Sequence, residues 1–207
     1  MDKYAQLRQS AYDANMQLPE LGLVIFTFGN VSVADRDSGV FAIKPSGVPY
    51  KNLTPENMVI IDFDGKVLNG KLRPSSDTLT HAVLYKQFAR INSIVHTHST
   101  YATAWAQSLR DIPLYGTTHA DHLTNDIPCC PPMEDNMIKG NYEFETGNQI
   151  VNHLKWKNLN YEEVEMILVG NHGPFSWGSS PEKAVYNSAV LEELAKMACL
   201  TERINPD

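Results

Sequence analysis

Apolar residues recur at helical spacing in the first segment of the chain, residues 2–18. A stripe that repeats every three to four residues is typical of a helix with one buried face. Pro19 lacks an amide donor, so we expect this helix to end before it. The apolar positions of the stripe are Leu7, Ala11, Ala14 and Leu18.

Later segments also contain helix signals. The pattern predicts helices at about 100–107, 146–156 and 181–203. The last of these follows Ser180-Pro181-Glu182, which supplies a cap, a first-turn proline and a first-turn acid. Ser75-Ser76-Asp77 offers three capping residues ahead of an apolar run, and therefore predicts the start of a further helix.

Short apolar or alternating runs separated by turn residues predict strands in the first half of the chain. Asp64-Gly65 lies between two of these runs and indicates a hairpin. A later apolar run over 93–98 ends in two histidines, and 166–169 is a second such run. The strands predicted in the first half are Val24 to Phe26, Val31 to Ala34, Val40 to Ile43, Val59 to Ile61 and Lys66 to Leu68.

This order of elements favours one α/β domain over residues 1–207. We expect a mixed, largely antiparallel sheet between two layers of helices. The sequence contains no repeat, linker or low-complexity tract that would divide the chain.

Composition and charge exclude several classes of protein. The chain has 207 residues and a net charge of −7 without a Lys/Arg cluster, which argues against nucleic-acid binding. Its first ten residues are polar, and no apolar run approaches the roughly 20 residues of a membrane span, so we expect a cytoplasmic protein. Its three cysteines form no disulfide framework and no metal-binding Cys-X-X-Cys motif.

Three histidines form a candidate metal site. His96 and His98 are two residues apart in a predicted strand, so their side chains point to the same face. His172 follows another apolar run and precedes Gly173-Pro174, which indicates a loop. Three imidazoles with one open position are typical of catalytic zinc. The alternative is that each histidine is an ordinary hydrogen-bonded side chain.

Three loops contain small residues, hydroxyls and free amide groups suited to a phosphate. Each loop alone is equally compatible with an ordinary turn, and Ser75-Ser76-Asp77 with a helix cap. Their occurrence together with the histidines favours a phosphorylated substrate. The candidate phosphate-binding residues are Gly29, Asn30, Lys44, Ser46, Gly47, Ser75 and Ser76.

Six motifs in chain order resemble the class II aldolase/epimerase family. The similarity extends from the first helix to Asn205-Pro206, which is essentially the whole chain. The motifs are Phe28-Gly29-Asn30-Val31-Ser32, Ile43-Lys44-Pro45-Ser46-Gly47-Val48, Arg73-Pro74-Ser75-Ser76-Asp77-Thr78, Ile94-Val95-His96-Thr97-His98-Ser99, Gly116-Thr117-Thr118-His119-Ala120-Asp121 and His172-Gly173-Pro174-Phe175.

The resemblance implies roles for particular residues. His96, His98 and His172 match the family's zinc ligands, one ion per chain, and Asp77 matches an aspartate at the metal in the family's epimerases. The family's aldolases have a catalytic glutamate at the position of Asp77, so the aspartate favours an epimerase. Asp121 matches an epimerase acid/base residue. The candidate phosphate-binding residues match the family's phosphate-binding positions.

The resemblance therefore implies a zinc-dependent sugar-phosphate epimerase that breaks and remakes a carbon–carbon bond by retro-aldol cleavage. The first alternative is an aldolase of the same fold. The second is a binding protein that has kept the fold and lost turnover. The choice of sugar pathway is left open by the sequence.

The resemblance also implies an assembly. We expect a homotetramer with active sites at subunit boundaries, acting on a small sugar phosphate and not on nucleic acid or membrane. Epimerases of this kind have a C-terminal tail with an acid/base tyrosine. The sequence ends at Asp207 without this tail, and leaves open whether the full-length protein has it.

Overall fold

Seven strands form one sheet in the order β4-β3-β2-β1-β5-β7-β6. The computed structural model describes residues 2–206. Every pairing between these strands is antiparallel, and the one parallel pairing in the described residues is an isolated bridge between Cys129 and Leu168. The strands are β1 Asn30–Asp35, β2 Val40–Ile43, β3 Val59–Asp62, β4 Val67–Asn69, β5 Ser93–His96, β6 Met166–Val169 and β7 Gly173–Gly178.

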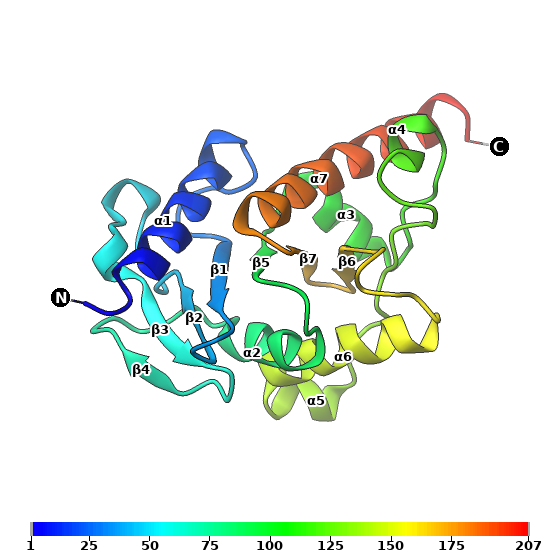
Figure 1. Ribbon diagram of the computed structural model, residues 1–207. Helices are drawn as coiled ribbons and strands as arrows, with labels where there is room; N and C mark the ends of the chain where they lie inside the picture. Colours follow the sequence, from blue (N-terminus) through cyan, green and yellow to red (C-terminus); the bar gives the residue numbers. More distant parts are fainter. Residues whose placement is uncertain (1, 207) are drawn as a thin grey trace.

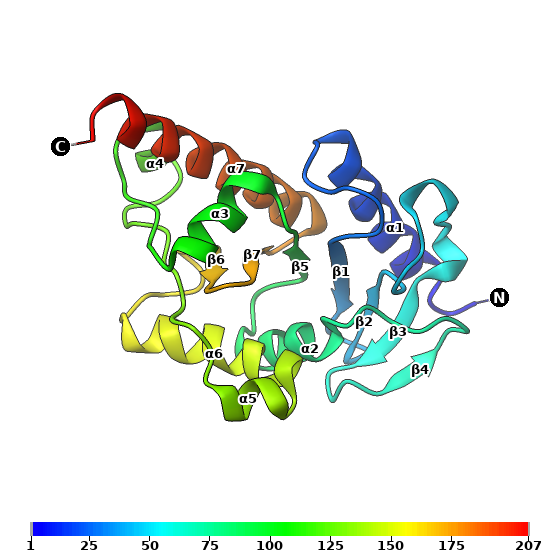
Figure 2. The same ribbon diagram turned by 180° about the vertical axis from the view of Figure 1, so that it is seen from behind.

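Helices cover both faces of the sheet, which gives three layers. Figures 1 and 2 show α1, α3 and α7 on one side and α2, α5 and α6 on the other. Alternate residues of β2 enter different cores: Phe41 and Ile43 pack with α2 and α6, whereas Val40 and Ala42 pack with α1. The helices are α1 Ala5–Glu20, α2 Thr78–Gln87, α3 Thr100–Ser108, α4 Thr117–Ala120, α5 Asp135–Lys139, α6 Tyr142–Trp156 and α7 Pro181–Ile204. The predicted α/β architecture with a largely antiparallel sheet is confirmed.

One predicted strand is wrong. Val24 to Phe26 belongs to a loop between α1 and β1 and forms no ladder. Gly22 and Phe26 both have left-handed backbone angles, φ 69° and φ 54°, which turn the chain too sharply for a strand. The other four predicted strands of this half correspond to β1, β2, β3 and β4, and Asp64-Gly65 lies in the predicted hairpin.

A second error concerns β7. The sequence interpretation placed Gly173-Pro174 in a loop, but these residues begin a strand between β5 and β6. The strand tolerates proline at its second residue, and the Pro174 carbonyl still accepts a bond from the Thr97 amide at 3.4 Å. The loop that bears His172 is therefore the short turn that joins β6 to β7.

The predicted helices are present with shifted ends. α1 continues through Pro19 to Glu20, because proline in the last turn removes only one donor. The left-handed backbone of Gly22, just beyond the helix, then turns the chain away. Ser180 caps α7 as predicted and accepts from the Lys183 amide. Asp77 directly precedes α2, but its side chain makes no cap bond. The short helices α4 and α5 lack a periodic apolar pattern long enough to predict.

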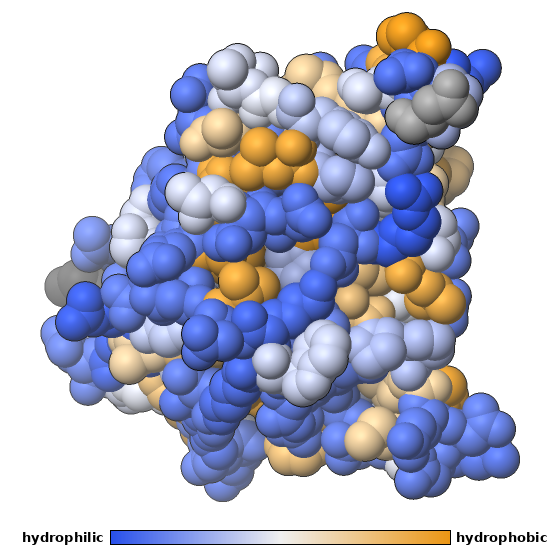
Figure 3. Space-filling model, turned by 90° about the vertical axis from the view of Figure 1, so that its right-hand side faces the viewer, coloured by the Kyte–Doolittle hydropathy of each residue, from blue (hydrophilic) through white to orange (hydrophobic). Residues whose placement is uncertain are grey.

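None of the helices within residues 2–206 combines the length and apolar character needed to cross a membrane. Figure 3 shows the side of the molecule that lies at the right in Figure 1. Its surface is mostly hydrophilic, and its apolar side chains form separate patches.

Gly147 allows α2 and α6 to pack closely. A Cβ built at this position would lie 2.7 Å from the Cβ of Val83 and 3.1 Å from the carbonyl oxygen of Thr80. Overpacking by the added methyl group should cost about 1–3 kcal/mol, whereas alanine gains roughly 1 kcal/mol in helix propensity. We therefore expect Gly147→Ala to lower the free energy of unfolding. Urea unfolding measures this change. Lys155→Ala, exposed on the same helix, is the control, and an unchanged midpoint for Gly147→Ala would contradict the packing argument.

Candidate active site and metal centre

His96 is the last residue of β5, a strand buried along its whole length. It pairs with Asn30 of β1 on one side and with Phe175 of β7 on the other. Its Nδ1 lies 3.0 Å from the Pro174 carbonyl oxygen. Because a carbonyl only accepts, Nδ1 holds the proton and Nε2 has a free lone pair. A backbone contact of this kind is how proteins orient a metal-binding imidazole.

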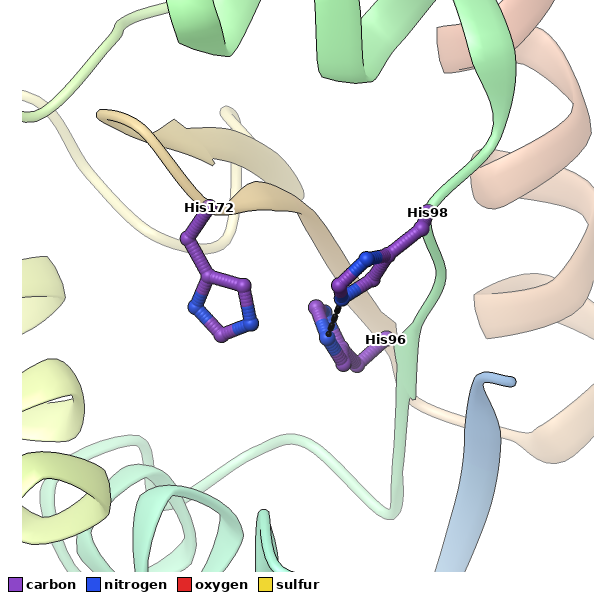
Figure 4. A group of neighbouring side chains, drawn as sticks. All are labelled: His96, His98 and His172. Carbon is purple, nitrogen blue, oxygen red and sulfur yellow. Dashed lines mark hydrogen bonds between the residues drawn. The ribbon is translucent and has the colours of Figure 1, made fainter. Parts of the chain in front are cut away.

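His98 and His172 meet His96 at the same place. His98 lies two residues beyond β5, with its Nε2 3.1 Å from Nε2 of His96. His172 faces both rings from the turn between β6 and β7, as Figure 4 shows. One ring nitrogen from each of the three residues lies within 4.8 Å of the others. Three imidazole nitrogens gathered in this way are a donor set that could hold one metal ion.

The surroundings keep His98 and His172 neutral. Burial lowers the pKa of His172 to about 3, and the nearby His96 ring adds to the effect. Burial, followed by His96, also lowers the pKa of His98. Nδ1 of His172 is buried and has no hydrogen-bond partner among the described residues. At neutral pH these two rings therefore offer lone pairs, as metal ligands must.

Asp77 lies beside the histidines but is held from the other side. Its Oδ2 accepts from Nδ2 of Asn30 at 2.7 Å and from Oγ of Ser75 at 3.2 Å. Burial raises the pKa of Asp77, but the nearby His96, His81 and His172 rings and the Asn30 amide outweigh burial, so the pKa lies below its usual value. The carboxylate is ionised next to the cluster, although it is outside the group of three that could share one ion.

The candidate phosphate loops meet in the same pocket. The Ser46 amide donates to the Arg73 carbonyl at 2.9 Å, and the Ser75 amide donates to the Lys44 carbonyl at 3.1 Å, so two of the loops are joined by backbone bonds. The third loop is joined through Asn30, whose Nδ2 lies 3.1 Å from Oγ of Ser75. The pocket has a volume of about 420 Å³. All seven predicted phosphate-binding residues line it, together with Asp77 and the three histidines.

Lys44 supplies a buried positive charge in this pocket. The residue is only 2% exposed, and its Nζ donates to the Thr27 carbonyl at 3.1 Å and lies 4.8 Å from the centre of the Tyr50 ring. It forms no ion pair with a carboxylate among residues 2–206. Burial lowers the pKa of Lys44 to about 8. An anion bound beside Lys44 would offset the cost of burying its charge.

Among the pocket residues that sequence reasoning missed are Tyr142 and Glu143. They lie at the start of α6, and the Tyr142 ring centre is 5.7 Å from that of His172. The predicted helix began four residues later, at 146, so these residues fell in an unassigned segment. The Tyr-Glu pair resembles any acidic first turn, and no signal in the sequence marks it as part of a site.

The structure does not bring Asp121 to this pocket. It follows α4, which lies beside the C-terminal part of α7, and is exposed there. Within one chain, the pocket residues come from the ends of β1, β2, β5 and β6 and from the starts of α2 and α6. Asp121 could therefore reach such a pocket only in another copy of the chain.

A known family matches nearly the whole chain. The family model for the class II aldolase and adducin N-terminal domain matches residues 9–199. This chain belongs to the class II aldolase family.

Relatives of this class II aldolase-family protein include sugar-phosphate enzymes. It is 48% identical to proteins named L-ribulose-5-phosphate 4-epimerase UlaF from Salmonella paratyphi B and Salmonella typhi, over 97% of this chain and 87% of theirs. Among solved structures, an L-fuculose 1-phosphate aldolase aligns with a TM-score of 0.81 at 24% identity, covering 97% of this chain and 88% of the other. The L-fuculose-1-phosphate aldolase from Thermus thermophilus aligns with a TM-score of 0.71 at 24% identity, covering 97% and 95%. These structures support the fold.

Replacing His98 tests the metal cluster of this class II aldolase-family protein. We expect His98→Asn to lose bound metal, and to lose turnover by about 10³-fold or more, because a metal supplies several kcal/mol of transition-state stabilisation. Elemental analysis and steady-state kinetics measure the two effects. His153→Asn, a half-buried histidine outside the pocket, is the control. Full metal occupancy in His98→Asn would exclude it as an essential ligand.

The buried ammonium of Lys44 predicts a pH dependence of substrate binding. Its folded-state pKa of about 8 lies below the ordinary value, so the positive charge is present below pH 8 and is lost above it. A phosphate monoester, with a second pKa of about 6, is already doubly charged throughout this range. We expect the KM for a sugar phosphate to rise by about tenfold between pH 7 and pH 9.

Two variants separate Lys44 from other causes of that rise. Lys44→Gln should have a high KM that is nearly independent of pH. Ser46→Ala should raise KM and keep the pH dependence, because it removes a hydroxyl and leaves the ammonium in place. The same slope in Lys44→Gln as in the wild type would assign the pH dependence to another group.

Proposed function

We propose that this protein is a metal-dependent epimerase that interconverts L-ribulose 5-phosphate and D-xylulose 5-phosphate. The observation that supports this most strongly is the pocket in which three imidazoles meet three anion-binding loops. A metal cluster and a phosphate cradle in one pocket suit a small phosphorylated sugar. The 48% identity to proteins named L-ribulose-5-phosphate 4-epimerase supports the choice of substrate.

The phosphate end is assigned to Gly29, Asn30, Lys44, Ser46, Gly47, Ser75 and Ser76. Serine hydroxyls, backbone amides and one ammonium form the donor set expected for a phosphate dianion. Gly47 has φ 72°, a left-handed conformation that glycine adopts without strain. This anchoring holds one end of the substrate through the reaction.

The metal end is assigned to His96, His98 and His172, with Asp77 beside them. The three imidazoles fit zinc, because their nitrogens converge, burial keeps His172 neutral and His96 is oriented by a backbone carbonyl. A bound divalent ion would supply positive charge where negative charge develops on the sugar's C2 and C3 oxygens. The Asp77 carboxylate would offset part of the ion's charge.

The reaction inverts C4, which bears no acidic hydrogen. A base removes the proton of the C4 hydroxyl, the C3–C4 bond breaks, and C4 becomes the aldehyde of glycolaldehyde phosphate. The electron pair of that bond remains on the three-carbon fragment. The phosphate loops keep the aldehyde in the pocket while it turns its other face to the fragment. When the bond re-forms, an acid returns a proton to the inverted C4 oxygen.

Asp121 is proposed as one of the two acid/base groups. It lies far from the pocket of its own chain, so the proposal requires active sites at the boundaries of a homo-oligomer, for which we propose a tetramer. Closed symmetric assemblies of this kind are common among soluble enzymes.

A cytoplasmic location also stays a prediction.

Conversion of L-ribulose 5-phosphate to D-xylulose 5-phosphate, assayed with the metal-loaded protein and again after chelation, tests the proposed function. We expect turnover that is lost with the metal and restored by zinc. The same assay should include a trap for free aldehyde, because an aldolase releases its product and an epimerase re-adds it. Stoichiometric release of glycolaldehyde phosphate without epimer would favour the aldolase. Absence of both products would contradict the proposed function.

Asp121→Asn tests the proposed acid/base residue. The change preserves volume but prevents proton transfer, so we expect epimerisation to fall by about 10²–10⁴-fold, the range for a lost general acid or base. Bound zinc, measured by elemental analysis on the same sample, should stay at the wild-type level. Normal turnover with normal zinc would show that another group transfers the proton.

A further inference from the structure

Asp121 lies on an outer loop over residues 112–127. The loop is closed at its neck by two backbone bonds between Ile112 and Ile127, each 3.0 Å long. The Asp121 carboxylate is exposed and makes no side-chain hydrogen bond with residues 2–206. A free carboxylate on a loop is well placed to act in a neighbouring copy, but only if the loop holds it in a fixed direction.

Two tyrosines connect this loop to α7. The Tyr186 hydroxyl lies 2.7 Å from Nε2 of His122, the residue next to Asp121. The Tyr115 hydroxyl donates to Glu202 at 3.0 Å. Tyr186 and Glu202 are 16 residues apart on one helix, or about 24 Å at 1.5 Å per residue. The two contacts therefore hold different ends of the loop, and only the first adjoins Asp121.

The direction of the first contact follows from its neighbours. Nδ1 of His122 lies 2.8 Å from the Thr118 carbonyl oxygen. A carbonyl only accepts, so Nδ1 holds the ring proton and Nε2 of the neutral ring is an acceptor. The Tyr186 hydroxyl therefore donates to Nε2. The imidazole is held from both sides, by the first turn of α4 and by α7, which fixes the residue that follows Asp121.

We propose that Tyr186 is a positioning residue for Asp121, acting through His122. This inference rests on the proposed function, in which Asp121 transfers a proton. The contact fixes the end of α4 against α7, so that each copy presents its carboxylate at one position and angle. Small misplacements of a reacting group lower turnover without weakening substrate binding.

Tyr186→Phe removes the hydroxyl and keeps the ring. We expect kcat to fall about tenfold, with KM and bound zinc unchanged, because phosphate and metal sites are untouched. His122→Phe should have the same effect, and the two changes together should be no worse than either alone. Tyr115→Phe is the matched control, because both tyrosines are 51% exposed and the hydroxyl of each joins the loop to α7. This variant should keep normal turnover.

A double-mutant cycle separates positioning from general stability. In the Asp121→Asn background, Tyr186→Phe should cause no further loss of kcat, because the group it positions is already gone. If the losses multiply, or if Tyr186→Phe alone keeps kcat within about twofold of the wild type, the inference is overturned.

Hydrogen exchange gives a readout that does not depend on activity. Tyr186→Phe should increase amide exchange in residues 117–123 and leave the strands unchanged, whereas unchanged exchange there would overturn the inference. Failure of the proposed function appears differently, as normal turnover in Asp121→Asn or as no epimerisation by the wild type. In either case the catalytic part of the inference falls as well, even if hydrogen exchange shows that Tyr186 holds the loop.

Discussion

The backbone at the end of β5 passes between two glycines that leave no room for a side chain. A Cβ on Gly29 would lie 2.9 Å from the His96 carbonyl oxygen, and a Cβ on Gly173 would lie 2.9 Å from the Thr97 carbonyl oxygen. Gly29 also has φ 71°, which other residues adopt at a cost. This close approach brings Asn30 to one side of His96 and His172 to the other. The rest of the pocket depends on it.

The two halves of the pocket follow from that arrangement. The antiparallel register between β1 and β5 sets Asn30 opposite His96, and Asn30 in turn bonds to both Ser75 and Asp77. The register between β5 and β7 places the β6–β7 turn beside the same strand end. A shift of one residue in either pairing would turn His96 away from the pocket. The half with the candidate phosphate loops and the half with the imidazoles are therefore fixed by the same sheet.

Local patterns predict much of the fold and of the candidate site. The strands β1 to β4 alternate or are apolar between turn residues, and α7 begins with a cap and a proline, so their positions follow from short-range chemistry. His96, His98 and His172 are recognisable because imidazoles at strand spacing are uncommon. β7 was missed because Gly173-Pro174 indicates a turn, whereas the strand is stabilised by pairing with β6 and with β5, and β5 is distant in sequence. Tyr142 shows the same limit, since its place in the pocket depends on tertiary packing, and the role proposed for Asp121 would depend on subunit packing.

In the proposed enzyme, one pocket holds the metal and the sugar phosphate together. Phosphorus-31 relaxation of L-ribulose 5-phosphate, measured on protein loaded with paramagnetic Mn²⁺, tests this claim directly. We expect strong broadening of the phosphorus signal of the bound substrate, which disappears when zinc replaces manganese and weakens in Lys44→Gln as binding is lost. Saturable binding of the substrate with no manganese-dependent broadening would place the phosphate away from the imidazole cluster and contradict the account.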